Sequence, residues 1–260
     1  MAGAASVNKL AQLAGPALGG GLIVVLDVHV YFAALLFFLV GAVSAGALNA
    51  DLRISGREPF GLEMLFGGFR HILRTRAVLG AITIDLVAVL FGGVIGLLPA
   101  IATELLNVGP EALGILRAMP AAGGLIVGAM LARFGLPWHA GKSFFVSLVV
   151  FAASILVLSV SGNFWLSLAL LAIYGGADMI SINVRQTLVQ TMTPDGLRGR
   201  VSSVNSVSIN ASNQLGDFRA GVMAAAIGVP PAIAVGAAIT LGVTLAWFRL
   251  FPELRQIERL

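Results

Sequence analysis

The sequence predicts an all-α fold: a polytopic membrane helical bundle with about eight transmembrane helices. Three observations predict it. Hydrophobic residues occupy 58% of the 260 positions and charged residues only 11%, whereas an ordinary soluble domain carries roughly 25% charged residues. Eight apolar stretches approach or exceed the ~20 residues that a helix needs to cross a bilayer. Lysine and arginine also gather in alternate connections between these stretches, which is typical of multi-pass membrane proteins.

The apolar stretches follow one another along the whole chain. We expect spans at residues 10–25, 29–48, 78–105, 112–134, 143–161, 164–190, 201–227 and 231–251. The first stretch is short, and it is interpreted as a span because the second follows after Asp27 and Val28. Several others exceed one crossing, which favours tilted or kinked helices. Pro99 and Pro120 lie inside spans and are expected to kink them.

The spacing of the spans divides the chain into three parts. Residues 1–48 are expected to form two helices, residues 49–76 a cytoplasmic linker, and residues 77–260 a six-helix unit. The linker contains an apolar helical stripe opposite two basic residues: Leu62, Leu65, Phe66, Phe69 and Leu73 form the stripe, and Arg70 and Arg74 lie opposite. This pattern fits a helix on the inner membrane surface, and it also fits a connector packed on the base of the bundle.

The distribution of basic residues predicts the orientation. The turns near Asp27, Gly109, Gly162 and Val229 contain no lysine or arginine, whereas the alternate connections and the C-terminal tail do. We therefore expect a multi-pass protein of the cell inner (plasma) membrane with both termini cytoplasmic. The net charge of +4 comes from basic residues scattered near segment ends. The lipid bilayer, and not a nucleic acid, is thus the expected partner.

Six charged side chains lie inside otherwise apolar stretches. They are Asp85, Arg117, Asp178, Arg185, Asp217 and Arg219. A charge at the bilayer centre costs at least ~3 kcal/mol, so it is kept where it faces a bundle interior, a partner or a water-filled path. This placement predicts transport. From their depths along the helices we expect two pairs, Asp85 with Arg185 and Asp217 with Arg117 or Arg219. Each pair is either a static staple or a gate or proton-coupling element.

Two polar stripes accompany these charges. Asp178, Ser181 and Arg185 share one helical face by their spacing, and Asp178 is the preferred coupling residue. The seventh span places four polar residues at near-helical spacing, with Gln214 beside them: Ser206, Asn210, Asn213 and Asp217. Together with Ser181, the serine and the amides of this group are candidates for a substrate cavity, because amides both donate and accept hydrogen bonds. The alternative is that they hold helices together.

The charges also repeat along the chain. From the third span onward the order is charged, charged, uncharged, twice over, which is typical of the inverted repeats of secondary transporters. The rhythm predicts that the uncharged fifth and eighth spans face lipid. Glycine pairs four residues apart, Gly92 with Gly96 and Gly124 with Gly128, favour close helix contacts. Trp138, Trp165 and Trp247 lie near segment ends and are expected to be interfacial anchors.

Enzyme chemistry is not predicted. The three histidines have no acidic or cysteine partners at metal-ligand spacing, and the chain contains no G-x-S-x-G elbow and no Walker phosphate loop. We therefore expect no catalytic residues, no metal site and no cofactor. An ion gradient is the expected energy source.

Two motifs carry a family resemblance. Gly15, Pro16, Gly19 and Gly20 form G-P-x-x-G-G, which resembles the core of the antiporter motif in the fifth helix of major facilitator superfamily exporters. The stretch TPDGLRGRV at 193–201, which contains Arg198, Gly199 and Arg200, is similar to the loop between the tenth and eleventh helices of the enterobactin-exporter-like branch. The runs RQT at 185–187, SNQLG at 212–216 and PELR at 252–255 continue the likeness.

The resemblance implies a partial major facilitator fold. Members have twelve spans in two halves, whereas this chain matches from the fifth helix onward, and residues 49–76 would link the halves. The implied function is secondary active transport, a proton-coupled efflux antiporter for a small molecule such as a siderophore or drug. The alternative is a non-transporting membrane fragment or interaction subunit of a truncated transporter. The implied partners are substrate, protons and a missing N-terminal half.

Overall fold

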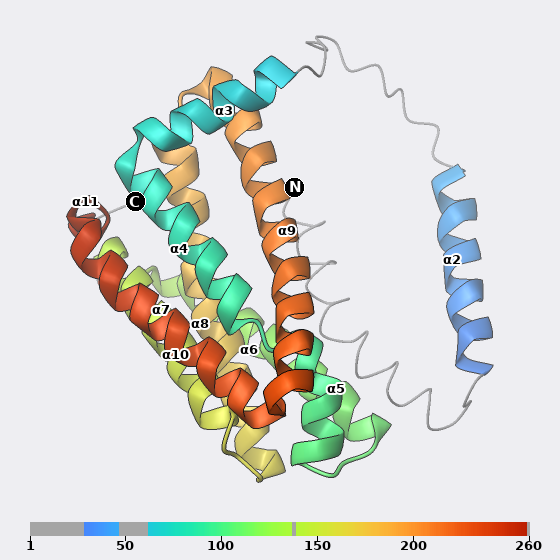
Figure 1. Cartoon of the computed structure of the whole chain (residues 1–260). Helices are drawn as coiled ribbons and strands as arrows, with labels where there is room; N and C mark the ends of the chain where they lie inside the picture. Colours follow the sequence, from blue (N-terminus) through green and yellow to red (C-terminus); the bar gives the residue numbers. More distant parts are fainter. Residues whose placement is uncertain (1–28, 47–61, 137–138, 259–260) are drawn as a thin grey trace.

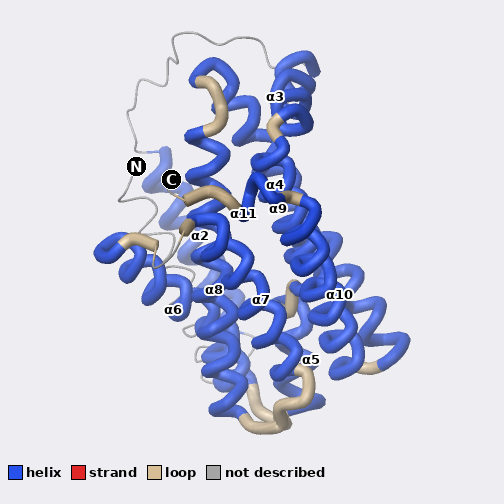
Figure 2. The backbone as a smooth tube through the Cα atoms, turned by 90° about the vertical axis from the view of Figure 1, so that its left-hand side faces the viewer, coloured by secondary structure: helices blue, strands red, loops and turns tan. Residues whose placement is uncertain are grey.

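The computed structural model describes residues 29–46, 62–136 and 139–258. These residues contain no strand, and the expected all-α fold is confirmed. In chain order the helices are α2 (Val30–Gly46), α3 (Leu62–Arg74), α4 (Arg76–Gly92), α5 (Leu98–Ala100), α6 (Pro110–Phe134), α7 (Ala140–Leu158), α8 (Phe164–Thr191), α9 (Asp195–Ile227), α10 (Val229–Leu250) and α11 (Pro252–Arg255). The long helices from α4 to α10 form one bundle, seen from two directions in Figures 1 and 2.

Five helical segments are long and apolar enough to span a bilayer. They are Arg76–Leu105, Pro110–Phe134, Ala140–Leu158, Phe164–Thr191 and Val229–Leu250. The 33-residue α9 runs along the bundle with them, but its charged and amide side chains lower its hydropathy. The 17-residue α2 is at the short end of the spanning range and stands apart from the bundle in Figure 1. The expected span at 10–25 lies outside the described residues.

The bundle is held together by apolar side chains between neighbouring helices. α6 packs along α8, α7 lies against α8 and α10, and α4 packs on α9 and α10. One core cluster contains Leu116, Phe151 and Leu171, and a second contains Phe144 and Leu188. These clusters leave α6 and α9 as helices with one face on the bundle and another face exposed.

The expectation that uncharged spans face lipid is wrong for α7. In α7, 61% of the most apolar stretch is buried, compared with 22% in α6, which carries Arg117. Absence of charge does not move a helix to the lipid, because apolar side chains pack as well on neighbouring helices as on acyl chains. The second uncharged span, α10, is 39% buried by the same measure.

Glycines bring α6 and α8 into backbone contact. A Cβ atom at Gly175 would overlap the carbonyl of Pro120, and one at Gly123 would overlap the carbonyl of Ala172. Gly124 also faces the Gly175 carbonyl, at 3.4 Å from an added Cβ. Small residues are therefore required where these two helices cross. Pro120 lies inside the continuous helix α6, and its carbonyl is part of this contact.

The third expected span is interrupted before its proline. α4 ends at Gly92, Gly93 and Val94 leave the helix, and a short 3₁₀ turn at Ile95–Leu97 leads into α5. A π-helical turn at Ile101–Leu105 follows. The break thus begins six residues before Pro99, where we expected a kink. Gly93 has an extended backbone (ψ 123°), which ends the helical hydrogen bonding there.

The linker helix α3 packs on the base of the bundle. Its Gly68 lies against the backbone of Arg200 in α9, and Ile72 is buried in a cluster with Val78 and Val201. Phe69 and Leu73, two members of the expected apolar stripe, are each 51% exposed. The described part of α3 therefore packs through Gly68 and Ile72, while Phe69 and Leu73 stay exposed. This contact fits a connector packed on the base of the bundle, and the exposed apolar side chains fit a helix on the inner membrane surface as well.

The tryptophans differ in their surroundings. Trp165 is exposed at the start of α8, as an interfacial residue would be. Trp247 instead donates from Nε1 to Thr83 Oγ1 at 3.1 Å and stacks on Phe251, so it joins α10 to α4. Trp138 lies outside the described residues.

Candidate transport site

The expected pair between Asp85 and Arg185 is present. Arg185 Nε lies 3.3 Å from Asp85 Oδ2, and both side chains are at most 5% exposed. Ser181 donates from Oγ to Asp85 Oδ1 at 3.3 Å, and Arg185 Nη1 donates to Asn205 Oδ1 at 2.9 Å. This buried network joins α4, α8 and α9. Burial of both charges fits mutual compensation, because a single charge left in such a site would be strongly destabilising.

Arg219 does not pair with Asp217 as we expected. It donates from Nε to the Leu90 carbonyl and from Nη2 to the Phe91 carbonyl, each at 2.9 Å, and it lies over the Phe91 ring. These carbonyls are at the C-terminal end of α4, where the break removes their usual helical donors. A cation is also favoured at a helix C-terminus by the helix dipole. Arg219 is thus a side-chain cap for a broken membrane helix.

Two glycines give Arg219 access to those carbonyls. An added Cβ at Gly216 of α9 would lie 3.0 Å from the Val89 carbonyl oxygen, and one at Gly236 of α10 would overlap the Phe91 carbonyl. Both helices therefore approach the end of α4 at backbone distance. This contact was not predicted from the sequence, because the break in the third span was not predicted.

Asp217 lies on the other side of the same break. Its carboxylate abuts Gly96, where an added Cβ would come within 2.6 Å of Oδ1. Gly96 belongs to the 3₁₀ turn that begins the second part of the interrupted helix. An acidic group is favoured near the N-terminal end of a helical segment. Among the described residues, no ion pair joins Asp217 to Arg117 or Arg219, and this expected pairing is wrong.

A polar cavity of about 320 Å³ lies beside this break. Arg117 from α6, Asp178 and Tyr174 from α8, Asn213 from α9 and Ile95 from the interrupted helix all line it. Arg117 is exposed and Asp178 is half-buried. The cavity therefore combines a cation, an acid, an amide and a phenol on helices α6, α8 and α9 of the bundle. Such a set can bind polar and charged groups of a ligand.

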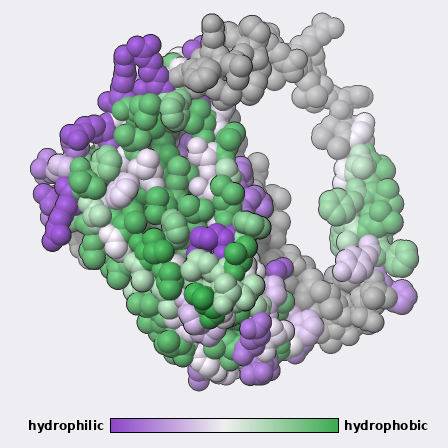
Figure 3. Space-filling model, viewed as in Figure 1, coloured by the Kyte–Doolittle hydropathy of each residue, from purple (hydrophilic) through white to green (hydrophobic). Residues whose placement is uncertain are grey.

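The remaining predicted cavity residues are distributed more widely. Ser181 is buried beside Asp85, whereas Ser206, Asn210 and Gln214 are exposed along α9. Asn210 donates back to the Ser206 carbonyl of its own helix at 2.9 Å. Figure 3 shows hydrophilic residues in the middle of the face over α9, with hydrophobic residues around them. Only Asn213 of these five residues lines the described cavity.

The structure describes one of the two family-like motifs. Arg198, in the loop motif, donates from Nε to the Gln190 carbonyl at 3.1 Å, which fixes the turn between α8 and α9. Gly199 is exposed, and Arg200 lies under α3 at Gly67 and Gly68. This motif thus connects the linker helix to the bundle. The antiporter-like motif, Gly15, Pro16, Gly19 and Gly20, lies outside the described residues.

Sequence reasoning missed two residues of the site. Asn205 holds Arg185, and Tyr174 lines the cavity while stacking on Phe151 with ring centroids 4.5 Å apart. Asn205 directly precedes the polar stripe that begins at Ser206, so its amide inside a span was an available signal. Tyr174 lies four residues before Asp178, and helical spacing places both on one face.

A polar, charged cavity inside a bundle of apolar helices is the arrangement that a helical membrane transporter requires. The family comparison agrees and is more specific: residues 4–259 match the family described as transmembrane secretion effector. The chain belongs to this family, which is part of the major facilitator superfamily of transporters. The comparisons with curated proteins and with solved structures give no match.

Proposed function

We propose that this protein exports a small molecule through a path lined by α4, α6, α8 and α9, driven by an ion gradient and most simply by protons. The observation that carries the proposal is the half-buried Asp178 in a polar cavity that also holds Arg117. An acid at membrane depth is expensive unless it faces a bundle interior, a partner or a water-filled path, and a polar cavity fits the last of these. Asp178 can bind a proton and can also bind a cationic or hydrogen-bonding substrate, so the two can compete for one site.

The broken helix supplies a movable element for this mechanism. Asp217 and Arg219 of α9 bracket the break in α4 from opposite sides, and Ile95 of the break lines the cavity. Discontinuous membrane helices with exposed dipole ends are common at the substrate sites of secondary transporters. A shift of α9 would therefore move the cavity wall and the break together.

The side chains that line the cavity indicate the class of substrate. Amide, phenol and charged groups of both signs favour a polar small molecule with several hydrogen-bonding groups, such as a siderophore or a polar drug. The resemblance to the enterobactin-exporter-like branch supports a siderophore. The inner (plasma) membrane, with both termini cytoplasmic, follows from the placement of the basic loops.

Asp178→Asn tests the coupling role. In proteoliposomes with an imposed pH gradient and a fluorescent dye as the transported probe, the native protein is expected to move dye in proportion to the gradient. Asp178→Asn is expected to abolish this pH dependence, because the amide cannot release a proton. Glu111→Gln, at the exposed first turn of α6, is the matched control and should behave as the native protein does. A pH dependence unchanged in Asp178→Asn would remove Asp178 from the mechanism.

A second function is supported by the exposed polar face of α9. Asn210, Asn213 and Gln214 are exposed there, and polar groups at membrane depth need water or a protein partner. We propose that a missing N-terminal half covers this face in the complete transporter, and that without it the chain is a non-transporting interaction subunit. Dye transport by the purified chain alone would reject the subunit. Transport only after addition of a separate N-terminal half would support it.

A further inference from the structure

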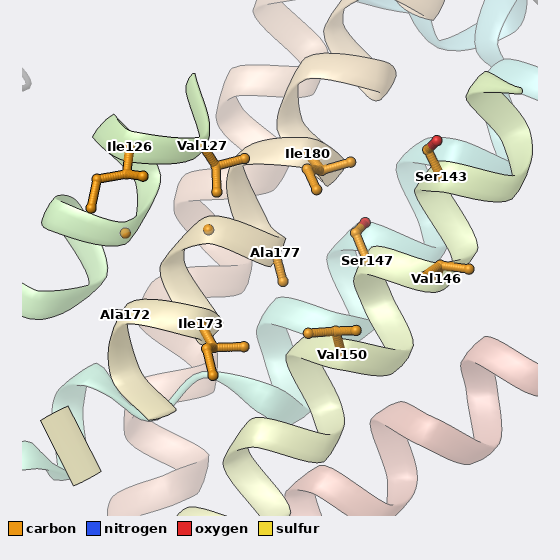
Figure 4. A pocket seen from close by; sticks show the side chains of 12 residues that line it. Ile126, Val127, Ser143, Val146, Ser147, Val150, Ala172, Ile173, Ala177 and Ile180 are labelled. Carbon is orange, nitrogen blue, oxygen red and sulfur yellow. The ribbon is translucent and has the colours of Figure 1, made fainter. Parts of the chain in front are cut away.

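A second cavity, unlike the transport site, opens on the opposite side of α8. It has a volume of about 510 Å³ and lies between α6, α7 and α8. In Figure 4, Ile126 and Val127 of α6 lie on one side, Val146 and Val150 of α7 on the other, and Ala177 and Ile180 of α8 between them. Its lining is almost entirely apolar. We call it the α7 groove.

The rim of the α7 groove faces the surrounding bilayer. Val146, Val150, Ile126 and Ile173 are 42%, 38%, 62% and 49% exposed, although they belong to segments that span the membrane. Along α7 the groove extends from Ser143 to Val150, roughly 10 Å at a helical rise of ~1.5 Å per residue. One leaflet of the hydrocarbon core is ~15 Å deep. The groove therefore begins near one membrane surface and ends near the bilayer centre.

Cations stand at the end of the groove nearest that surface. Lys142, Val146 and Val150 follow one another at four-residue spacing and share a stripe of α7. On α6, Ile126, Met130 and Arg133 form the corresponding stripe. Both stripes thus run from apolar residues in the groove to an exposed basic residue, on the side of the membrane that holds the other basic loops.

Two hydroxyls line the groove: Ser147 donates to the Phe144 carbonyl of its own helix, and Ser143 lies between the apolar and basic parts. Ser143 lines the groove one residue after Lys142, and its buried Oγ has no hydrogen-bond partner among the described residues. The first amides of α7 are occupied, because Ala140 N donates to the Glu258 carbonyl and Gly141 N to the Ile257 carbonyl. Glu258 also lies 3.9 Å from His139. Lys142 and Ser143, and not the helix end, are therefore the groups left for a ligand.

We propose that the α7 groove binds an anionic phospholipid of the leaflet on the basic-loop side. One acyl chain lies along Val146, Val150 and Ile173, an ester oxygen accepts a hydrogen bond from Ser143, and the phosphate lies near Lys142 and Arg133. The order of chemistry along the groove, apolar, hydroxyl, cationic, matches the order of acyl chain, ester and phosphate in such a lipid. A neutral lipid would fill the apolar part of the groove but would not compensate the charges of Lys142 and Arg133.

The test uses the full chain in nanodiscs that contain trace phosphatidylglycerol with a photoactivatable acyl chain. Labelling is expected on the α7 and α8 peptides that contain Val150 and Ile173. Val146→Trp and Val150→Trp fill the groove from exposed positions and should each lower this labelling about tenfold. Val157→Trp is the matched control, because Val157 is also exposed on α7 (44%) but does not line the groove. It should label as the native chain does.

The headgroup is tested separately by Lys142→Gln. With photoactivatable phosphatidylcholine as the neutral comparison, the native chain should prefer phosphatidylglycerol, and Lys142→Gln should weaken that preference about fivefold, the usual effect of one basic residue near the membrane surface. Labelling spread evenly over every lipid-facing helix, or equal in the Val146→Trp and Val157→Trp variants, would overturn the site. An unchanged preference in Lys142→Gln would overturn the assignment of the anionic headgroup. Each outcome is independent of dye transport.

Discussion

The buried ion pair of Asp85 and Arg185 shows what a single residue contributes to this bundle. Both partners are shielded from solvent, and each has a further polar neighbour, Ser181 or Asn205. Such a network stabilises one arrangement of α4, α8 and α9, because any other arrangement would leave a charge without compensation. The staple interpretation of this pair fits its burial better than the gate interpretation, since the described cavity does not reach it.

Removal of one partner of the Asp85–Arg185 pair is expected to lower the free energy of unfolding more than removal of both. Asp85→Leu should lower the free energy of unfolding by about 3–5 kcal/mol, because Arg185 then stays buried without a counter-charge. The double variant Asp85→Leu, Arg185→Met should recover most of this loss. Denaturant titration in detergent, followed by tryptophan fluorescence, measures both. A double variant less stable than the single one would show that the pair does not act as a unit.

Arg219 is a second residue that stabilises the fold, because its side chain binds carbonyls at the end of α4. Arg219→Leu should destabilise the protein by about 1–3 kcal/mol for each of the two carbonyls, Leu90 and Phe91, that it leaves unpaired. Arg249→Leu is the matched control, since Arg249 is exposed in the last turn of α10. The same unfolding titration compares them. Equal stabilities of the two variants would mean that Arg219 does not cap α4.

At the scale of helices, glycines bring α6 and α8 into backbone contact. Gly123 and Gly175 lie opposite carbonyls of the other helix and so hold these two walls of the polar cavity at backbone distance. Arg117 and Asp178, one on each helix, are then presented to the same space. The geometry of the candidate site therefore depends on glycines, which have no functional side chain.

Gly175→Val is expected to separate α6 from α8. The new side chain would overlap the Pro120 carbonyl, and overpacking of this kind costs about 1–3 kcal/mol. Gly242→Val serves as control, because an added Cβ there meets nothing within 4 Å. Thermal unfolding and dye transport should both fall for Gly175→Val and stay unchanged for Gly242→Val. A Gly175→Val protein of native stability would place the two helices farther apart than described here.

For the whole molecule, the sequence was sufficient for the fold class and for one of two ion pairs. Hydrophobic runs and basic loops predict helices because the bilayer allows few alternatives, and Asp85 with Arg185 followed from matching depths. The break after Gly92 could not be predicted, since glycine is also common in unbroken membrane helices. Because the break was not predicted, the free carbonyls that bind Arg219 were not predicted either, and Asp217 was assigned the wrong partner.

Water access to the cavity is the most direct measurement, and the chain suits it because it contains no native cysteine. Single cysteines at Asn213 and Ala121, which line the polar cavity, are predicted to react with a water-soluble thiol reagent in membrane vesicles. This reaction is expected with the native Asp178 in place. Single cysteines at Val146 and Val157, exposed toward lipid, should stay unreactive. Protection at Asn213 and Ala121 together with labelling at Val146 and Val157 would contradict an aqueous transport path lined by Arg117 and Asp178.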